Sequence, residues 1–160
     1  MPKAPDADLS DREYQELLAF RTAIRRFLHW SEEQATALGI SPAQHQLLLA
    51  IRGHRDPAGP TIGDVANVLL LRHHSAVGLV DRAVAAKLVV RRSDSEDQRV
   101  VRLRLTALGS RRLRQLAGLH LAELHRMMPG VGPALFAEEM FSGETFAGET
   151  FTEHTDMGAT

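Results

Sequence analysis

The residues that could carry chemistry in this 160-residue chain are first of all its eight histidines. A protein metal site needs several imidazole or carboxylate ligands that converge on one ion. His73 and His74 are neighbours in the sequence, so on a helix they would point about 100° apart. His120 and His125 are five residues apart, which also puts them on different faces of a helix. We therefore expect no metal site.

The motifs of common catalytic and phosphate-binding sites are also missing. The one Gly-x-Gly element, at residues 130–132, is followed by proline and follows no strand-like segment, unlike a phosphate loop. The sequence has no Gly-x-Ser-x-Gly element and no His-Glu-x-x-His pattern. Cysteine is absent, which excludes thiol chemistry and fits a reducing compartment. We expect a cytoplasmic protein that is not an enzyme, uses no cofactor and spans no membrane.

Arginine suggests a different chemistry. Residues 52–114 contain 13 Lys/Arg and 6 Asp/Glu, a local charge of +7. The rest of the chain contains 6 basic and 14 acidic residues, a charge of −8. A basic segment between acidic ends is typical of a nucleic-acid-binding face on an otherwise acidic protein. The alternative is that these arginines only solvate the surfaces of helices.

Within the basic segment, residues 73–86 have the pattern of an amphipathic helix. Apolar residues recur at steps of three and four, which places them on one face: Ala76, Val77, Val80, Ala83, Val84 and Leu88. The opposite face carries small or polar residues, which can approach base edges and phosphates: His74, Ser75, Gly78, Asp81 and Arg82. We interpret this helix as one that enters a DNA major groove, although the pattern alone also fits a surface helix that covers a core.

Three helices are expected before it. Each begins at a capping box, in which a Ser or Thr side chain and the residue three positions later cap each other: Ser10 with Glu13, Ser41 with Gln44, and Thr61 with Asp64. The helices are expected over residues 11–38, 42–51 and 62–69, and the candidates for burial on the third are Val65, Ala66, Val68 and Leu69. Only a few residues separate the third helix from residue 73, so the pair is predicted to form a helix–turn–helix.

After Lys87 the apolar period changes from about 3.6 to 2, which predicts strands. The strands are expected over residues 88–92 and 100–105, with Val101, Leu103 and Leu105 on one face of the second. The polar residues 93–98 between them predict a hairpin loop that projects into solvent as a wing. A final helix is expected from a cap at Thr106 to about residue 128, before Pro129.

Several of these segments resemble the MarR (multiple-antibiotic-resistance regulator) family. The resemblance runs from about residue 12 to 128 and is carried by four elements: residues 41–44 (Ser-Pro-Ala-Gln), 79–82 (Leu-Val-Asp-Arg), 97–99 (Asp-Gln-Arg) and 105–109 (Leu-Thr-Ala-Leu-Gly). It implies a mainly α fold with a small β-wing, in which a winged helix–turn–helix lobe joins a helical dimerisation region. It also implies a homodimeric repressor that binds a pseudo-palindromic operator in double-stranded DNA and is released by a small ligand.

Carried over to this chain, the resemblance implies which residues contact DNA. His73, His74, Ser75 and Val77 would lie at the groove-facing start of the recognition helix. Arg99 would be the wing-tip arginine in the minor groove, where the negative potential attracts a guanidinium, and Asp97 would hold that guanidinium in place. Further contacts are expected from residues near these: Arg72, Gly78, Arg82 and Arg92.

The family's effector pocket lies near the junction of its first, second and fifth helices. There the chain offers Arg25, His29, Trp30 and His45, and a cation beside an aromatic ring suits an aromatic carboxylate. The alternative is that Trp30 belongs to the core and the arginine to a solvated face.

The expected organisation follows from these segments. Residues 1–9 form a disordered lead-in, residues 10–40 and 106–141 the dimerisation region, residues 41–105 the DNA-binding lobe, and residues 142–160 a disordered or loosely docked tail. The tail contains a repeated Gly-Glu-Thr-Phe, whose phenylalanines could instead dock on a partner subunit. A winged-helix module that binds protein rather than DNA is the alternative function.

Overall fold

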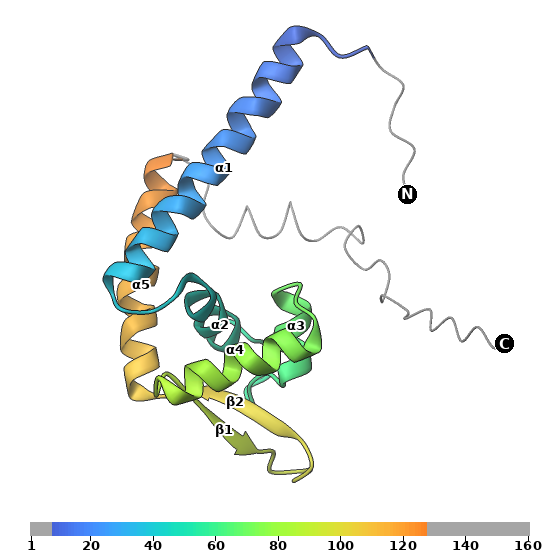
Figure 1. The fold of residues 1–160 in the computed structure, drawn as a ribbon, viewed down its shortest axis with the longest axis vertical. Helices are drawn as coiled ribbons and strands as arrows, with labels where there is room; N and C mark the ends of the chain where they lie inside the picture. Colours follow the sequence, from blue (N-terminus) through green and yellow to red (C-terminus); the bar gives the residue numbers. More distant parts are fainter. Residues whose placement is uncertain (1–7, 128–160) are drawn as a thin grey trace, which may run out of the picture. The chain divides into compact units, whose positions relative to one another are not determined.

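The computed structural model describes residues 8–127, which form five helices and a two-stranded sheet (Figure 1). In order these are α1 (Asp11–Ala37), α2 (Pro42–Arg52), α3 (Ile62–Val68), α4 (His73–Ala85), β1 (Val89–Ser93), β2 (Val101–Leu105) and α5 (Ala107–Met127). The predicted mainly helical α+β fold with a small wing is confirmed. The chain divides into two compact units, residues 1–117 and 118–160.

Some predictions concern residues outside this range. The lead-in up to residue 7, the segment 134–141 and the tail 142–160 with its repeated Gly-Glu-Thr-Phe lie outside the described residues.

Local hydrogen bonds explain where the first three helices begin. The hydroxyl of Ser10 accepts from the backbone N–H of Glu13, and the carboxylate of Glu13 accepts from the backbone N–H of Ser10. The same reciprocal pair forms at the start of α2 and of α3. Because each box satisfies two backbone groups that the helix itself leaves unpaired, it fixes the first turn. All three predicted starts are confirmed.

The core lies between α2, α3, α4 and β2. Its fully buried side chains include Leu47 and Leu48 of α2, Val65 of α3, Val80 of α4 and Leu103 of β2. These residues come from segments far apart in the sequence, so the helices and the hairpin stabilise one another by burying a common apolar surface.

Some burial predictions need correction. Val68 is 63% exposed and Leu69 is half-buried, because both line an open hollow between α2 and α3. On α4 the buried face includes Leu79, which the sequence pattern had missed, whereas Val77 and Val84 are only half-buried. The buried stripe on α4 is thus rotated slightly from the predicted one.

The hairpin pairs β1 with β2 in antiparallel register, with Val89 opposite Leu105 and Arg92 opposite Arg102. Both strands begin one residue later than predicted. The backbone N–H of Leu103 also donates to the carbonyl oxygen of Pro60 at 2.8 Å. The loop before α3 therefore lies along the outer edge of β2.

Helix α1 buries little of its surface against this lobe. Only Ser31 and Ala35 are buried, and the N-terminal part of the helix extends away from α2 (Figure 1). The rest of α1 exposes large apolar side chains: Tyr14, Leu17, Leu18, Phe20, Ile24 and Leu28.

Candidate nucleic-acid interface

Helix α4 turns a polar surface to solvent at its N-terminus. His73, His74 and Ser75 are exposed, as is Arg72 just before them. The next residue, Ala76, is fully buried in the core. The buried face thereby fixes the helix while its first turn stays accessible, as readout of a groove requires.

The turn between α3 and α4 closes without glycine. Leu70 adopts a left-handed backbone conformation with φ of 53°, and its side chain is 87% exposed. The N–H of the next residue, Leu71, donates to the carbonyl oxygen of Ala66 at 2.8 Å. This bond ends α3 and sets the direction in which α4 begins, and α4 itself has no side-chain cap.

The other predicted contact residues on α4 and β1 differ in exposure. Val77 and Gly78 are half-buried, whereas Arg82 and Arg92 are exposed. Within the part of the chain that the structure describes, neither arginine forms an ion pair. Both guanidinium groups can therefore bind an external anion.

The wing tip is folded by two aspartates. Oδ1 of Asp94 accepts from the backbone N–H groups of Glu96 at 2.8 Å and Asp97 at 3.3 Å. The carboxylate of Asp97 accepts from the backbone N–H of Arg99 at 2.9 Å. Among the described residues it makes no ion pair with the Arg99 guanidinium, so Asp97 holds the backbone and not, as expected, the side chain.

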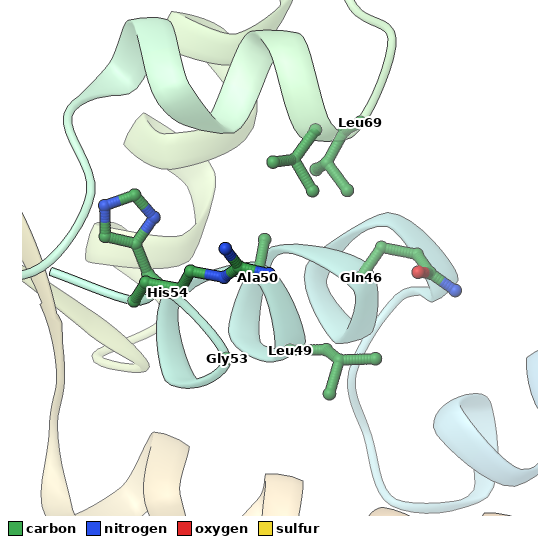
Figure 2. A pocket seen from close by; sticks show the side chains of 8 residues that line it. Gln46, Leu49, Ala50, Gly53, His54 and Leu69 are labelled. Carbon is green, nitrogen blue, oxygen red and sulfur yellow. The ribbon is translucent and has the colours of Figure 1, made fainter. Parts of the chain in front are cut away.

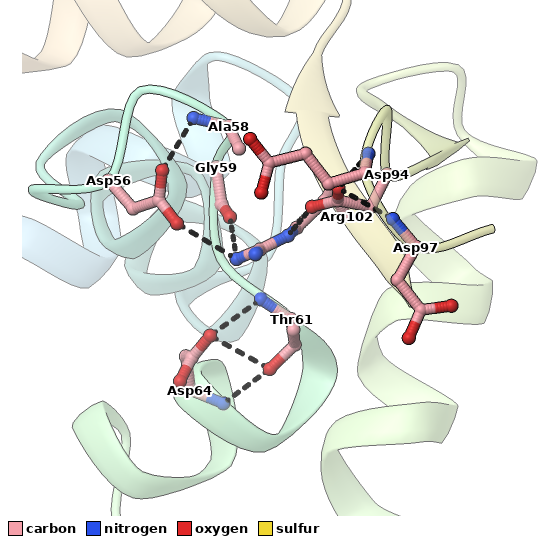
Figure 3. Close-up of polar contacts among 9 residues, drawn as sticks. Asp56, Ala58, Gly59, Thr61, Asp64, Asp94, Asp97 and Arg102 are labelled. Atoms are coloured by element: carbon pink, nitrogen blue, oxygen red, sulfur yellow. Dashed lines mark hydrogen bonds and ion pairs between the residues drawn. The ribbon is translucent and has the colours of Figure 1, made fainter. Parts of the chain in front are cut away.

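Arg102 ties the base of the wing to the loop that precedes α3 (Figure 3). Its Nε donates to Asp94 Oδ2 at 2.7 Å, and its Nη1 donates to Asp56 Oδ2 and to the carbonyl oxygen of Gly59, both at 3.1 Å. The side chain is only 21% exposed. We call Arg102 with Asp56, Asp94 and Gly59 the wing clamp.

The wing clamp depends on an ionised Asp94. The N–H of Glu96 and then the Arg102 guanidinium lower the pKa of the Asp94 carboxyl below its ordinary value. A group whose pKa is depressed by folding stabilises the fold above its unfolded pKa and loses that effect as the pH falls through the folded pKa. The clamp therefore holds at neutral pH and weakens only in acid.

On its other side the hairpin is tied to α4. Arg91 Nη2 donates to Asp81 Oδ1 at 2.6 Å. Sequence analysis had placed Asp81 on the face toward DNA and had assigned no role to Arg91, Asp56, Asp94 or Arg102. The one sequence signal for these contacts was the pairing of the two predicted strands, which places several arginines close together on the hairpin.

The residues expected to bind an effector do not converge. Arg25 is exposed on α1, and His29 Nε2 lies 3.4 Å from Glu33 on the same exposed face. The ring of Trp30 packs at 5.9 Å from that of Phe27. His45 is buried in α2 and is the only one of the four that lines the small cavity of about 250 Å³ between α1 and α2.

Among the larger hollows that border α2, two have Leu49 in their walls. One, of about 530 Å³, lies between α2 and α3 and is lined by Leu49, Val68, Leu69 and His54 among others (Figure 2). The other, of about 570 Å³, lies between α2, β2 and the first turns of α5. Its wall combines Leu49, Leu105, Leu113 and Ala117 with two arginines, Arg52 and Arg114.

Two further observations concern residues 8–127 only. They contain no cluster of three His, Asp or Glu side chains that could hold a metal ion. None of their helices is long and apolar enough to cross a bilayer.

Solved structures share this fold. The crystal structure of CouR from Rhodococcus jostii RHA1, bound to p-coumaroyl-CoA, is 21% identical, with a TM-score of 0.67 over 92% of this chain and 100% of that one. AbsC from Streptomyces coelicolor, a MarR family transcriptional regulator, is 20% identical, with a TM-score of 0.67 over 88% of this chain and 95% of that one. MepR from S. aureus, solved in complex with DNA, is 16% identical, with a TM-score of 0.64 over 81% of this chain and 91% of that one.

At these identities the structures establish the fold alone. No curated protein matches the sequence. The sequence model of the MarR family matches residues 38–100, which run from the end of α1 through α2, α3, α4 and β1 to the wing loop. Over this segment the chain is similar in sequence to the MarR family, and the winged-helix fold around the segment is the one that it shares with AbsC.

Proposed function

We propose that this chain regulates transcription by binding double-stranded DNA through α4 and the wing, and that it is not an enzyme. One observation carries the proposal: the exposed start of α4 belongs to the same compact unit as the hairpin arginines that form no ion pair within residues 8–127. The DNA complex of MepR, which shares the fold, supports it.

In this proposal each predicted contact has a role. His73, His74, Ser75 and Val77 approach base edges in the major groove, where each base pair presents a distinct pattern of donors and acceptors. Arg99, on the wing tip, enters the adjacent minor groove, and Asp97 shapes the turn that presents it. The remaining contacts go to phosphates or to the groove wall: Arg72, Gly78, Arg82 and Arg92.

We further propose that the DNA-binding species is a homodimer and a repressor. The apolar side chains that α1 exposes, from Tyr14 to Leu28, are more than an isolated soluble helix needs to leave uncovered. A second copy would bury them and place two recognition helices on half-sites about one helical turn apart, roughly 10 bp, in a pseudo-palindromic operator.

The test is binding to a labelled fragment of the gene's own upstream DNA at several salt concentrations, with unlabelled nonspecific competitor. The Arg99→Gln variant should reduce the slope of log affinity against log salt by about one. Arg12→Gln, an exposed arginine at the start of α1, should leave the slope unchanged. The mass of the complex should correspond to two chains on one operator.

Two results would contradict the proposal. If wild-type binding were weak, independent of salt and fully displaced by competitor, the alternative of a winged-helix module that binds protein would be favoured. If the slope were the same for both variants, Arg99 would not be a DNA contact.

We also propose that an anionic, partly apolar ligand releases the DNA. The hollow between α2, β2 and α5 supports this better than the four residues from the sequence, because its two arginines and its apolar wall suit an aromatic carboxylate. CouR, which shares the fold, was solved with p-coumaroyl-CoA. A ligand there would touch both the DNA-binding lobe and α5.

The effector site can be tested with two matched variants. Benzoate and cinnamate are titrated into the protein–operator complex. Since a hydrogen bond between charged groups contributes about 1.5–3 kcal/mol, Arg114→Gln should raise the ligand concentration needed for release roughly tenfold or more. Arg25→Gln should not change it. If Arg25→Gln raised that concentration and Arg114→Gln did not, the effector site would lie on α1. If neither acid released the DNA from the wild-type complex, release by aromatic acids would be refuted.

A further inference from the structure

Three arginines of the hairpin lie on the face that points away from the core. Because side chains alternate along a strand and Arg92 lies opposite Arg102, Arg92, Arg102 and Arg104 share one face. The other face carries the buried Val89 and Leu103 toward the core. The three arginines therefore all lie on the side that meets the loop before α3.

One of these three arginines is neutralised inside the protein. In the wing clamp, the Arg102 guanidinium is held by Asp94 and Asp56 and donates to the Gly59 carbonyl (Figure 3). Asp56 also accepts from the N–H of Ala58. Both carboxylates are thus already engaged, and neither forms an ion pair with another arginine in the described part of the chain.

The other two arginines remain exposed and without an ion pair within residues 8–127. Arg92 and Arg104 line a hollow of about 440 Å³ together with Pro57 and Ala58 of the loop. Arg104 lies over the backbone of Gly59, since a Cβ added there would come 3.5 Å from Arg104 Cδ.

The two side chains can reach one anion together. Arg92 and Arg104 are diagonal neighbours on paired strands, a separation of about 7–8 Å that long side chains can span. A guanidinium matches the oxygens of a phosphoryl group through two parallel hydrogen bonds and does not lose its charge. Arg102 lies opposite Arg92 and two residues before Arg104 on β2. Because its guanidinium is fixed by two carboxylates, it holds this part of the hairpin in place.

We propose that Arg92 and Arg104 form a phosphoryl-binding site at the base of the wing, on the face toward the loop before α3. The proposal rests on the proposed function in one respect, because a backbone phosphate of bound DNA is one source of the group. A phosphate-bearing small molecule is the other source. Arg104 is the new binding residue, and Arg102 is a positioning residue.

The test measures both sources with wild type, Arg104→Gln and the control Arg12→Gln. In the DNA arm, Arg104→Gln lowers the slope of log affinity against log salt by about 0.9, the value for one phosphate contact. It does so on operator and on nonspecific DNA alike, because a phosphate contact does not depend on sequence. In the second arm, pyrophosphate is titrated calorimetrically into the protein without DNA.

The outcomes separate the sources. A changed slope without pyrophosphate binding assigns the site to DNA, and pyrophosphate binding that Arg104→Gln abolishes assigns it to a small molecule. If Arg104→Gln behaves as Arg12→Gln in both arms, the phosphoryl site is refuted even though the wild type binds DNA. If the wild type binds no DNA, the proposed function fails, and the pyrophosphate arm alone decides the site. Circular dichroism checks that each variant is folded.

Discussion

Replacing Gly109 with alanine is expected to lower the free energy of unfolding by at least about 3 kcal/mol, the upper range for overpacking a well-packed site. Gly109 lies in the first turn of α5, and a Cβ built there would overlap the backbone carbonyl of Leu88. Neither the Leu88 backbone nor the first turn of α5 can shift easily, because hydrogen bonds of Thr106 hold the two together. Thr106, which caps the helix, donates to the Lys87 carbonyl at 2.7 Å and accepts from the N–H of Gly109 at 2.9 Å.

The same substitution elsewhere in α5 provides the control. A Cβ at Gly118 meets no atom within 4 Å among the described residues. Alanine there should raise stability by about 0.5–1 kcal/mol, because glycine inside a helix is conformationally costly. Urea unfolding of the two variants measures the difference. Equal effects of the two substitutions would show that α5 does not begin in contact with Leu88.

The elements that sequence analysis placed correctly are those determined by neighbouring residues. The boxes at Ser10, Ser41 and Thr61 define helix starts within four residues of chain, so tertiary contacts do not alter them. The change from a period of 3.6 to 2 after Lys87 likewise located the hairpin, to within one residue. Local hydrogen bonding and apolar period were sufficient there.

Burial depends instead on which elements meet. Val68 fits an apolar helical face, yet it is 63% exposed, because it lines an open hollow between α2 and α3. On α4, Leu79 is buried in the core cluster to which α2 and β1 also contribute. Such rotations of a few tens of degrees lie within the width of an apolar stripe and cannot be read from spacing alone.

The wing shows the same limit at the candidate site. Arg99 and Asp97 are proposed as site residues from a short motif, whereas the carboxylate partners of Arg102 are 8 and 46 residues away in the sequence. The hairpin register brings Asp94 close, but only the fold brings Asp56 to the same guanidinium. The sequence could therefore suggest candidate DNA contacts but not the residues that hold the wing in place.

The loop that carries Asp56 leads to the second large prediction. Gly59→Ala is expected to cost about 3 kcal/mol of stability, as the sum of a left-handed backbone penalty and a steric overlap. Gly59 has φ of +84°, and a Cβ there would lie 2.5 Å from the carbonyl oxygen of Leu103 in β2. Moving the loop away would also break the bond from Leu103 N–H to the Pro60 carbonyl and pull the Gly59 carbonyl from Arg102.

Gly39 separates the two contributions. It has φ of +72°, but a Cβ there meets nothing within 4 Å in the described structure, so Gly39→Ala should cost only the backbone penalty of about 1–2 kcal/mol. Urea unfolding gives both values. DNA binding measured below the unfolding transition should weaken for Gly59→Ala alone, because only that loop holds the wing clamp. If the two variants lost equal stability and bound DNA equally well, the wing would not depend on its contact with the loop before α3.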